Sequence, residues 1–239
     1  INSILGEINN FFREVDSFDQ ARNSGAFKYA VIRESTKSSA IVFVLNSESS
    51  KLREAIEKIE KFAEKTSAES VLVAYALPDE EKLDSEDYFA VKGAENLSET
   101  LLGKEFEYST LGFFQNITAV AEKMQEYCSS LLKKYNTKNA VLLDLYAGVG
   151  SFGIINSEFF RAVKIVESVP QCINAANDNI SKNNAKNCEA ILLDAKQLKK
   201  LNLDSKKPLF VITDPPRSGM DVKTIDELNR LLPEVIIYI

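Results

Sequence analysis

The sequence predicts an α/β protein in which a small α+β domain precedes a parallel, doubly wound sheet. Two observations carry this prediction. Beyond Asn136, apolar runs suited to buried strands alternate with helical segments, as is typical of parallel sheets. The first of these runs leads into the glycine-rich turn GVGSFG, which suits the connection from a strand to a helix at a ligand site.

Residues 1–108 are predicted to form the α+β domain, with a ferredoxin-like arrangement. Alternating residues indicate a first strand, and a serine-rich turn separates it from an apolar run. Behind that run, apolar side chains recur at helical spacing, with charged residues on the outer face. The expected elements are strands at 27–32 and 40–45, a helix at 52–62, a strand at 70–76 and an acidic loop at 78–88.

Residues 109–239 are predicted to form the domain with the parallel sheet. A long helix is expected from Ile117, and Cys128 lies on its apolar face, which indicates a core position. The strand pattern then recurs with helical segments between the strands. Strands are expected at 140–146, 163–167, 189–193, 209–213 and 235–239.

Composition limits the classes of function. The chain has 239 residues, with 29 basic and 35 acidic side chains, a net charge of −6 and a pI of about 5.0, so it lacks the basic footprint of a free-standing nucleic-acid binder. It has no histidine, which removes the usual imidazole base and the commonest zinc ligand, and we expect no metal site. Three widely spaced cysteines and the lack of an apolar run of membrane-spanning length predict a cytoplasmic protein with no membrane partner.

Acidic residues end three successive predicted strands. Ligands of doubly wound sheets bind beyond the carboxyl ends of the strands, so Glu167, Asp194 and Asp214 are expected to converge with the glycine turn. The pattern G-x-G-x-x-G alone leaves two cofactors open, a dinucleotide or S-adenosylmethionine. Asp144, four residues before Gly148, would repel a pyrophosphate if it lay near the turn, and it would suit a ligand with an ammonium group.

The segment TDPPRSG favours the second cofactor. Its two prolines prevent a regular helix or strand and stiffen the backbone at the expected cleft. An acidic residue followed by two prolines also occurs in amino-directed methyltransferases, where an aromatic residue normally follows. Arg217 follows here, which points away from an amino nitrogen as the methyl acceptor.

Seven segments, in order, resemble the RNA uracil-5-methyltransferase family: GAFKYAVIRES, LGFFQNITAVAEKM, DLYAGVGSFGI, VKIVES, LLDAKQL, TDPPRSGM and EVIIYI. The resemblance implies a Rossmann-like class I methyltransferase sheet, incomplete at its C-terminal end, and S-adenosylmethionine as the cofactor. It implies cofactor contacts at Gln115, Tyr146, Ser151, Glu167, Asp194 and Asp214, to which the glycine turn adds Gly148 and Gly150. A helix cap for Gln115 and a half-buried strand position for Tyr146 are the structural alternatives.

The resemblance also implies a covalent mechanism on RNA, either transfer or ribosomal. In the family a cysteine thiolate adds to carbon 6 of uracil, carbon 5 takes the methyl group, and a carboxylate removes the carbon 5 proton before the thiolate leaves. That cysteine would lie just past Ile239, so no catalytic residue is assigned in this chain. We therefore expect a fragment that lacks the family's N-terminal RNA-binding barrel and its C-terminal cysteine segment. We expect it to bind cofactor, not to methylate, and to be able to self-associate through an exposed strand at its C-terminal end.

Two alternatives to this interpretation remain open at this point. One is a methyltransferase with the same sheet that acts on another base or on a protein. The other is a cofactor-binding fragment without catalytic function. A dehydrogenase that uses NAD is a weaker third possibility, since the glycine pattern also fits it.

Overall fold

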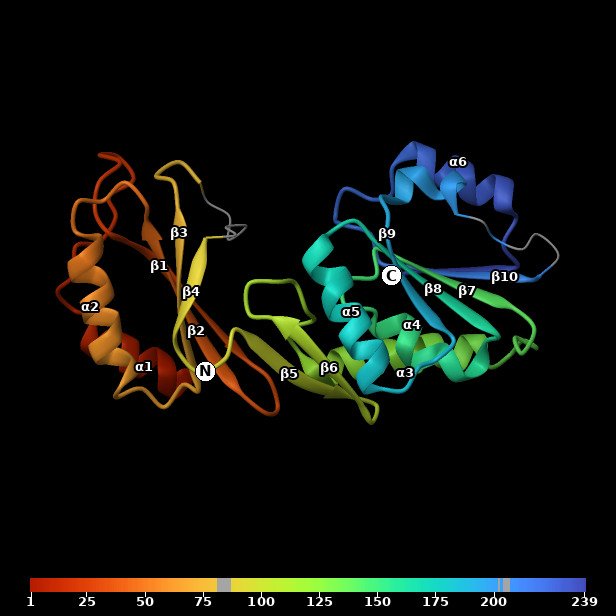
Figure 1. Ribbon diagram of the computed structural model, residues 1–239, viewed down its shortest axis with the longest axis horizontal. Helices are drawn as coiled ribbons and strands as arrows, with labels where there is room; N and C mark the ends of the chain where they lie inside the picture. Colours follow the sequence, from red (N-terminus) through yellow and green to blue (C-terminus); the bar gives the residue numbers. More distant parts are fainter. Residues whose placement is uncertain (81–86, 202, 204–206) are drawn as a thin grey trace. The chain divides into compact units, whose positions relative to one another are not determined.

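The computed structural model describes residues 1–80, 87–201, 203 and 207–239, so part of the expected acidic loop lies outside the described residues. The chain forms two compact units, shown in Figure 1. The first comprises Ile1–Ser98 and Ser109–Gly112, and the second comprises Glu99–Tyr108 and Phe113–Ile239. The expected boundary at residue 108 differs from this division, because most of the hairpin β5 (Asn96–Leu101) and β6 (Lys104–Ser109) belongs to the second unit.

A four-stranded sheet with two helices makes up the first unit. Its elements are α1 (Asn2–Phe11), β1 (Phe27–Glu34), β2 (Ser39–Asn46), α2 (Leu52–Ala63), β3 (Ser70–Ala76) and β4 (Tyr88–Lys92). The strand order is β1-β2-β3-β4, with β2 and β3 parallel and the two outer pairs antiparallel. This α-β-β-α-β-β succession differs from the β-α-β-β-α-β order of the expected ferredoxin-like arrangement.

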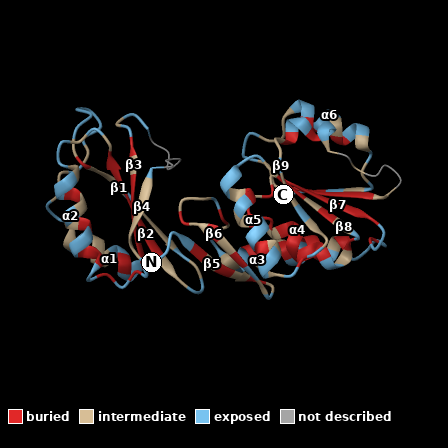
Figure 2. Cartoon of the chain, viewed as in Figure 1, coloured by how far each residue is buried: buried red, intermediate tan, exposed pale blue. Residues whose placement is uncertain are grey.

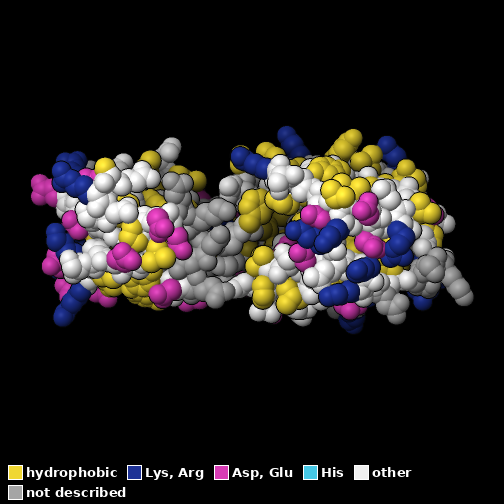
Figure 3. Space-filling model, turned by 90° about the horizontal axis from the view of Figure 1, so that it is seen from above, with side chains coloured by type: hydrophobic (Ala, Val, Ile, Leu, Met, Phe, Trp, Pro, Cys, Tyr) yellow, Lys and Arg dark blue, Asp and Glu magenta, His cyan; other side chains and the backbone are white. Residues whose placement is uncertain are grey.

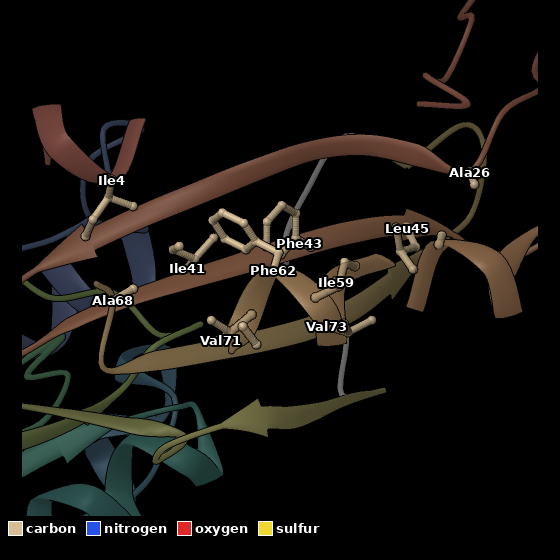
Figure 4. Close-up of a cluster of buried hydrophobic side chains, with 12 residues drawn as sticks. Ile4, Ala26, Ile41, Phe43, Leu45, Ile59, Phe62, Ala68, Val71 and Val73 are labelled. Atoms are coloured by element: carbon tan, nitrogen blue, oxygen red, sulfur yellow. The ribbon is translucent and has the colours of Figure 1, made fainter. Parts of the chain in front are cut away.

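The core of the first unit lies between the sheet and α1 and α2, which cover one face of it (Figure 4). Alternate residues of β2 point to opposite faces, so Phe43 meets Phe62 of α2 edge to face at 5.7 Å. Neighbouring β2 residues Val42 and Val44 belong to a second cluster on the opposite face. Because both faces bury apolar side chains, β2 is apolar along nearly its whole length rather than alternating.

A parallel five-stranded sheet forms the centre of the second unit, as the sequence predicts. Its strands are β7 (Val141–Leu145), β8 (Ala162–Glu167), β9 (Cys188–Leu192), β10 (Leu209–Thr213) and β11 (Val235–Tyr238), in the order β11-β10-β7-β8-β9. The connecting elements are α3 (Thr118–Leu132), α4 (Ser151–Asn156), the short 3-10 helix η1 (Ser157–Phe159), α5 (Pro170–Lys182), the 3-10 segment η2 (Ala195–Lys200) and α6 (Val222–Leu231).

Helices cover both faces of this sheet. In Figure 1, α3, α4 and α5 lie on one side and α6 on the other, and the strands between them are buried, as Figure 2 shows. Leu143 and Val211 pack toward Leu198 of η2 and Leu228 of α6. Covering both faces explains why the central strands are mostly apolar in the sequence, apart from Asp144 in β7 and Thr213 at the end of β10.

Charged side chains of both signs are interspersed on the surface, with hydrophobic side chains among them (Figure 3). On α6 and β11 the exposed apolar residues are Val222, Ile225, Ile236 and Tyr238. Among the described residues, no helix combines the length and the apolar character needed to cross a lipid bilayer.

Candidate functional site

The strand order of the second unit reverses between β7 and β10. The loops that follow these two strands therefore diverge and leave a crevice at the carboxyl edge of the sheet, where α/β proteins bind ligands. A pocket lies at this edge. The polar or glycine residues that line it include Gln115, Gln125, Tyr146, Gly148, Ser151 and Asp214.

The glycine turn after β7 has an unusual backbone. Gly148 and Gly150 have φ angles of 53° and 84°, and Tyr146 has a φ of 56°. Positive φ is readily adopted by glycine but strained for a bulky residue such as tyrosine. At Gly150 an added Cβ would also lie 3.1 Å from a methyl group of Ile165, so the turn packs tightly on β8. Strain at an aromatic residue that lines a pocket favours a functional role for Tyr146.

Asp144 lies beneath this turn rather than on the pocket wall. It is 1% exposed, and its carboxylate accepts a hydrogen bond from the backbone N–H of Gly153 at 2.7 Å. Burial raises the pKa of Asp144 to about 7, opposed by the Gly153 hydrogen bond and reinforced by the negative charges of Asp214 and Glu167. Asp144 therefore lies close to the glycine turn, as the sequence analysis considered, but it is buried beneath the turn and does not line the pocket.

Glu167, at the end of β8, joins two turns. Its Oε2 accepts a hydrogen bond from the N–H of Gly148 at 3.0 Å, and its Oε1 accepts from the N–H groups of Ser168 and Val169 at 2.6 and 3.0 Å and from the Ser168 hydroxyl at 3.1 Å. A carboxylate has about four acceptor positions, two on each oxygen. Oε2 therefore keeps an acceptor position for a ligand hydroxyl.

Asp194 follows β9, and the backbone places it beside the end of β8. The N–H of Leu193 donates to the carbonyl of Glu167 at 2.9 Å, which joins the ends of the two strands. One carboxylate oxygen of Asp194 caps η2 by accepting from the N–H of Lys196 at 2.9 Å. This cap is a structural role that the sequence did not predict, and the cofactor contact of Asp194 stays a prediction.

Asp214, after β10, contacts Gln115 from the segment before α3. The Nε2 of Gln115 donates to Asp214 Oδ2 at 3.4 Å. Burial raises the pKa of Asp214, and the Gln115 hydrogen bond opposes that shift. Gln115 does not cap α3, because the N-cap is Ile117 and no side chain bonds the helix start. The structure therefore brings these two predicted residues together across 99 positions of sequence.

The pocket also contains residues to which the sequence assigned no role. Phe113, Phe114 and Met124 line it, and the ring of Phe114 stacks on Tyr108 at 4.1 Å. Gln125 lines it from α3 and is 2% exposed. The sequence did offer a signal for Gln125, because it is a polar residue on the apolar face of a predicted helix.

None of the three cysteines, all of which lie in described residues, has the properties of a nucleophile. Burial raises the pKa of Cys128 and of Cys188 to about 11 and also raises that of Cys172. A thiol acts as a nucleophile only as the thiolate, so these environments disfavour covalent chemistry. The assignment of no catalytic cysteine in this chain remains a prediction.

Comparison with known proteins places the chain in a family. The model of the tRNA (uracil-5-)-methyltransferase family matches residues 89–239. An uncharacterized RNA methyltransferase of Caldanaerobacter subterraneus is 27% identical over 228 residues, which cover 93% of this chain and 49% of the relative. One of Lactobacillus johnsonii is 34% identical over 149 residues, which cover 62% of this chain and 32% of that protein.

A solved structure shows the same fold. The tRNA (uracil-54, C5)-methyltransferase of Pyrococcus abyssi, solved in complex with S-adenosyl-L-homocysteine, matches with a TM-score of 0.74 and 23% identity over 98% of this chain and 55% of its own. The chain thus spans about half the length of the Caldanaerobacter relative and of the Pyrococcus enzyme. The class I methyltransferase sheet predicted from the sequence is confirmed. Because the family model covers well over half of its residues, the chain belongs to the tRNA (uracil-5-)-methyltransferase family.

Proposed function

We propose that the second unit binds S-adenosylmethionine at the carboxyl edge of its sheet, and that the protein of which this chain is a part methylates carbon 5 of uridine in RNA. The observation that carries the proposal is the gathering of negative charge under and around the glycine turn. Asp214 and Glu167 are near enough to Asp144 to raise its pKa. Such a site suits a ligand with positive charge.

The same charges argue against a dinucleotide. A pyrophosphate at the glycine turn would lie beside the Glu167 carboxylate, and charges of the same sign repel strongly in a partly buried site. A sulfonium and an ammonium group would be attracted there instead. The carboxylates at this edge of the sheet, Asp214 in the pocket wall and Glu167 at the glycine turn, therefore favour S-adenosylmethionine over NAD, although the glycine pattern fits both.

The polar groups fit the parts of this cofactor in the order of the strands. Glu167 on β8 offers an acceptor for ribose hydroxyls, and Asp194 on β9 offers a carboxylate oxygen for the adenine amino group. The amino-acid end would then lie toward β7 and β10, where Gln115, Ser151 and Asp214 line the pocket. When bound, the cofactor supplies a methyl group on a positively charged sulfur.

The covalent route of the family requires a thiolate, and the three cysteines, whose pKa values are all raised by burial, do not provide one at neutral pH. Our proposal is therefore that this chain supplies the cofactor site and that the nucleophile and RNA contacts belong to the longer protein. In that protein a thiolate would add to carbon 6, and carbon 5 would take the methyl group as the bond from that group to the cofactor sulfur breaks and S-adenosylhomocysteine leaves. Loss of the carbon 5 proton and of the thiolate would then restore the ring.

Titration calorimetry with S-adenosylhomocysteine and with NAD tests the cofactor assignment. We expect binding of S-adenosylhomocysteine alone, and Asp214→Asn should weaken it while the exposed α6 variant Asp226→Asn leaves it unchanged. Binding of NAD in place of S-adenosylhomocysteine would overturn the proposal.

A second assay tests whether this chain can methylate RNA by itself. After incubation of the chain with S-adenosylmethionine and an RNA transcript, we expect no 5-methyluridine in the nuclease digest by mass spectrometry. The full-length protein in the same assay should produce it. Formation of 5-methyluridine by this chain alone would show that the nucleophile lies within residues 1–239.

A further inference from the structure

Gln125 is a buried polar residue at the wall of the proposed cofactor pocket. It lies on α3 among the buried residues Ala121, Cys128 and Ser129 and is 2% exposed. It lines the pocket together with Ser151 and Asp214. A glutamine at a buried helix position is unfavourable unless its amide groups are used.

Only one half of the Gln125 amide has a partner. Its Nε2 donates to the hydroxyl oxygen of Ser151 at 3.3 Å. Its Oε1 is buried and has no hydrogen-bond partner among the described residues. An unpaired buried acceptor at a pocket wall indicates a group that a ligand completes.

The Ser151 contact has a direction that matters for binding. Since the Ser151 oxygen accepts from Gln125, its own hydrogen remains available to another acceptor. The two side chains together therefore offer one donor, the Ser151 hydroxyl, and one acceptor, Gln125 Oε1. A zwitterionic amino acid needs this combination, because its carboxylate accepts hydrogen bonds and its ammonium donates them.

We propose that Gln125 determines specificity for the amino-acid end of the cofactor, by holding the Ser151 hydroxyl toward the ligand carboxylate and by accepting from the ligand ammonium. This inference rests on the proposed function, which places that end of the ligand toward β7 and β10. It adds a residue of α3 to a site otherwise built from strand ends and turns.

Two ligands separate this role from a general structural one. S-adenosylhomocysteine carries the amino-acid end, and 5′-methylthioadenosine lacks it but keeps the adenosine and the sulfur. Gln125→Met keeps the length of the side chain and removes both amide groups. We expect this variant to lower the affinity for S-adenosylhomocysteine roughly tenfold by calorimetry, equivalent to about 1.4 kcal/mol. The affinity for 5′-methylthioadenosine should change by less than about twofold.

A matched control is Ser129→Ala on the same helix. Ser129 is buried and donates to Asn156 Oδ1 at 2.7 Å, but it does not line this pocket. It should lower the melting temperature without changing the ratio of the two affinities. Gln125→Glu gives a second variant of nearly identical shape that keeps an acceptor for the ligand ammonium but loses the Nε2 donor to Ser151, so it should lower the affinity for S-adenosylhomocysteine less than Gln125→Met does.

The outcomes distinguish the two proposals. If the unsubstituted chain binds neither ligand, the proposed function fails and this inference fails with it. If the unsubstituted chain binds both ligands, and Gln125→Met lowers both affinities equally or lowers neither, the cofactor site stands and the proposed role of Gln125 is wrong. A loss of affinity for S-adenosylhomocysteine alone supports the proposed role of Gln125.

Discussion

Asn179 on α5 and Glu107 on β6 are joined by two hydrogen bonds of opposite direction. The N–H of Glu107 donates to Asn179 Oδ1 at 2.8 Å, and Asn179 Nδ2 donates to the carbonyl of Glu107 at 3.1 Å. Asn183, one helical turn later, bonds the N–H and carbonyl of Glu105 in the same way at 3.0 and 2.6 Å. Two side-chain amides thus pair with the edge of β6 as a neighbouring strand would.

Replacement of Asn179 should destabilise the second unit more than a usual helix substitution. Its Nδ2 also donates to the carbonyl of Val149 at 3.2 Å, so the hairpin and the glycine turn depend on one buried side chain. Asn179→Ala leaves several backbone groups unpaired, and we expect a loss of roughly 2–3 kcal/mol in the free energy of unfolding. Urea denaturation followed by circular dichroism measures it.

Asn177→Ala is the control for Asn179→Ala. Asn177 is exposed on the same helix, and alanine is the better helix former, so this change should be neutral or slightly stabilising. Equal destabilisation by both variants would mean that the contacts to β6 contribute nothing beyond helix propensity.

The hairpin β5–β6 also shows what the sequence could not predict. Its pairing with α5 depends on side chains about 75 residues away, so local pattern gave no indication that it belongs to the second unit. The five strands of the parallel sheet were predicted within a residue or two, because the central strands β7 and β10 are buried on both faces and the others are short, mostly apolar runs between helical segments. Strand β4 was missed because its apolar pattern is short, and helix α1 was missed although Ile4, Ile8 and Phe11 recur at helical spacing.

Similar reasoning applies to the site. Strand ends in a parallel sheet share one edge, so the positions of Glu167, Asp194 and Asp214 followed from topology. Their hydrogen bonds did not follow: the Asp194 cap of η2 and the contact between Gln115 and Asp214 depend on loop conformation. Gln125 was missed because one polar residue within an amphipathic helix has many possible explanations.

The stability of the chain should fall as the pH rises from about 4 to 7. The pKa of Asp144 is about 7 in the folded state and roughly 3.9 for an unfolded aspartate. Between these values the folded state holds a proton that the unfolded state has lost, so stability decreases with pH by up to about 1.4 kcal/mol per unit. Asp214, whose pKa is also raised by burial, contributes in the same direction.

The absence of histidine from the sequence makes this pH dependence easy to measure, because no imidazole titrates in the same range. Melting temperatures at pH 4, 5, 6 and 7 should decrease for the unsubstituted chain and decrease less for Asp144→Asn. The asparagine can still accept from Gly153 but does not ionise. An identical slope in both proteins would show that Asp144 does not titrate there.

The native cysteines should react slowly with a thiol reagent. At pH 8 a thiol with a pKa of about 11 is ionised in about one molecule in a thousand. Ellman's reagent should therefore label the folded chain much more slowly than free cysteine, and all three thiols should react promptly in urea. Fast labelling of one thiol in the folded chain would identify a reactive cysteine and reopen the question of a nucleophile within this chain.

Gly148 and Gly103 offer a matched pair for testing whether the glycine turn faces a ligand. Both have positive φ, at 53° and 76°, and at both an added Cβ meets no atom within 4 Å. Alanine at either position should therefore cost about 1–2 kcal/mol of stability through backbone strain alone. Gly148 lines the pocket and Gly103 does not.

Only Gly148→Ala should then impair binding of S-adenosylhomocysteine, because its methyl group enters the space that the ligand would occupy. We expect a loss of affinity of at least tenfold, roughly 1.4 kcal/mol, in calorimetry, against no significant change for Gly103→Ala at a similar loss of stability. Equal affinities in the two variants would place the ligand away from the glycine turn. Since the strain is common to both, a difference in affinity has to come from the position of the methyl group.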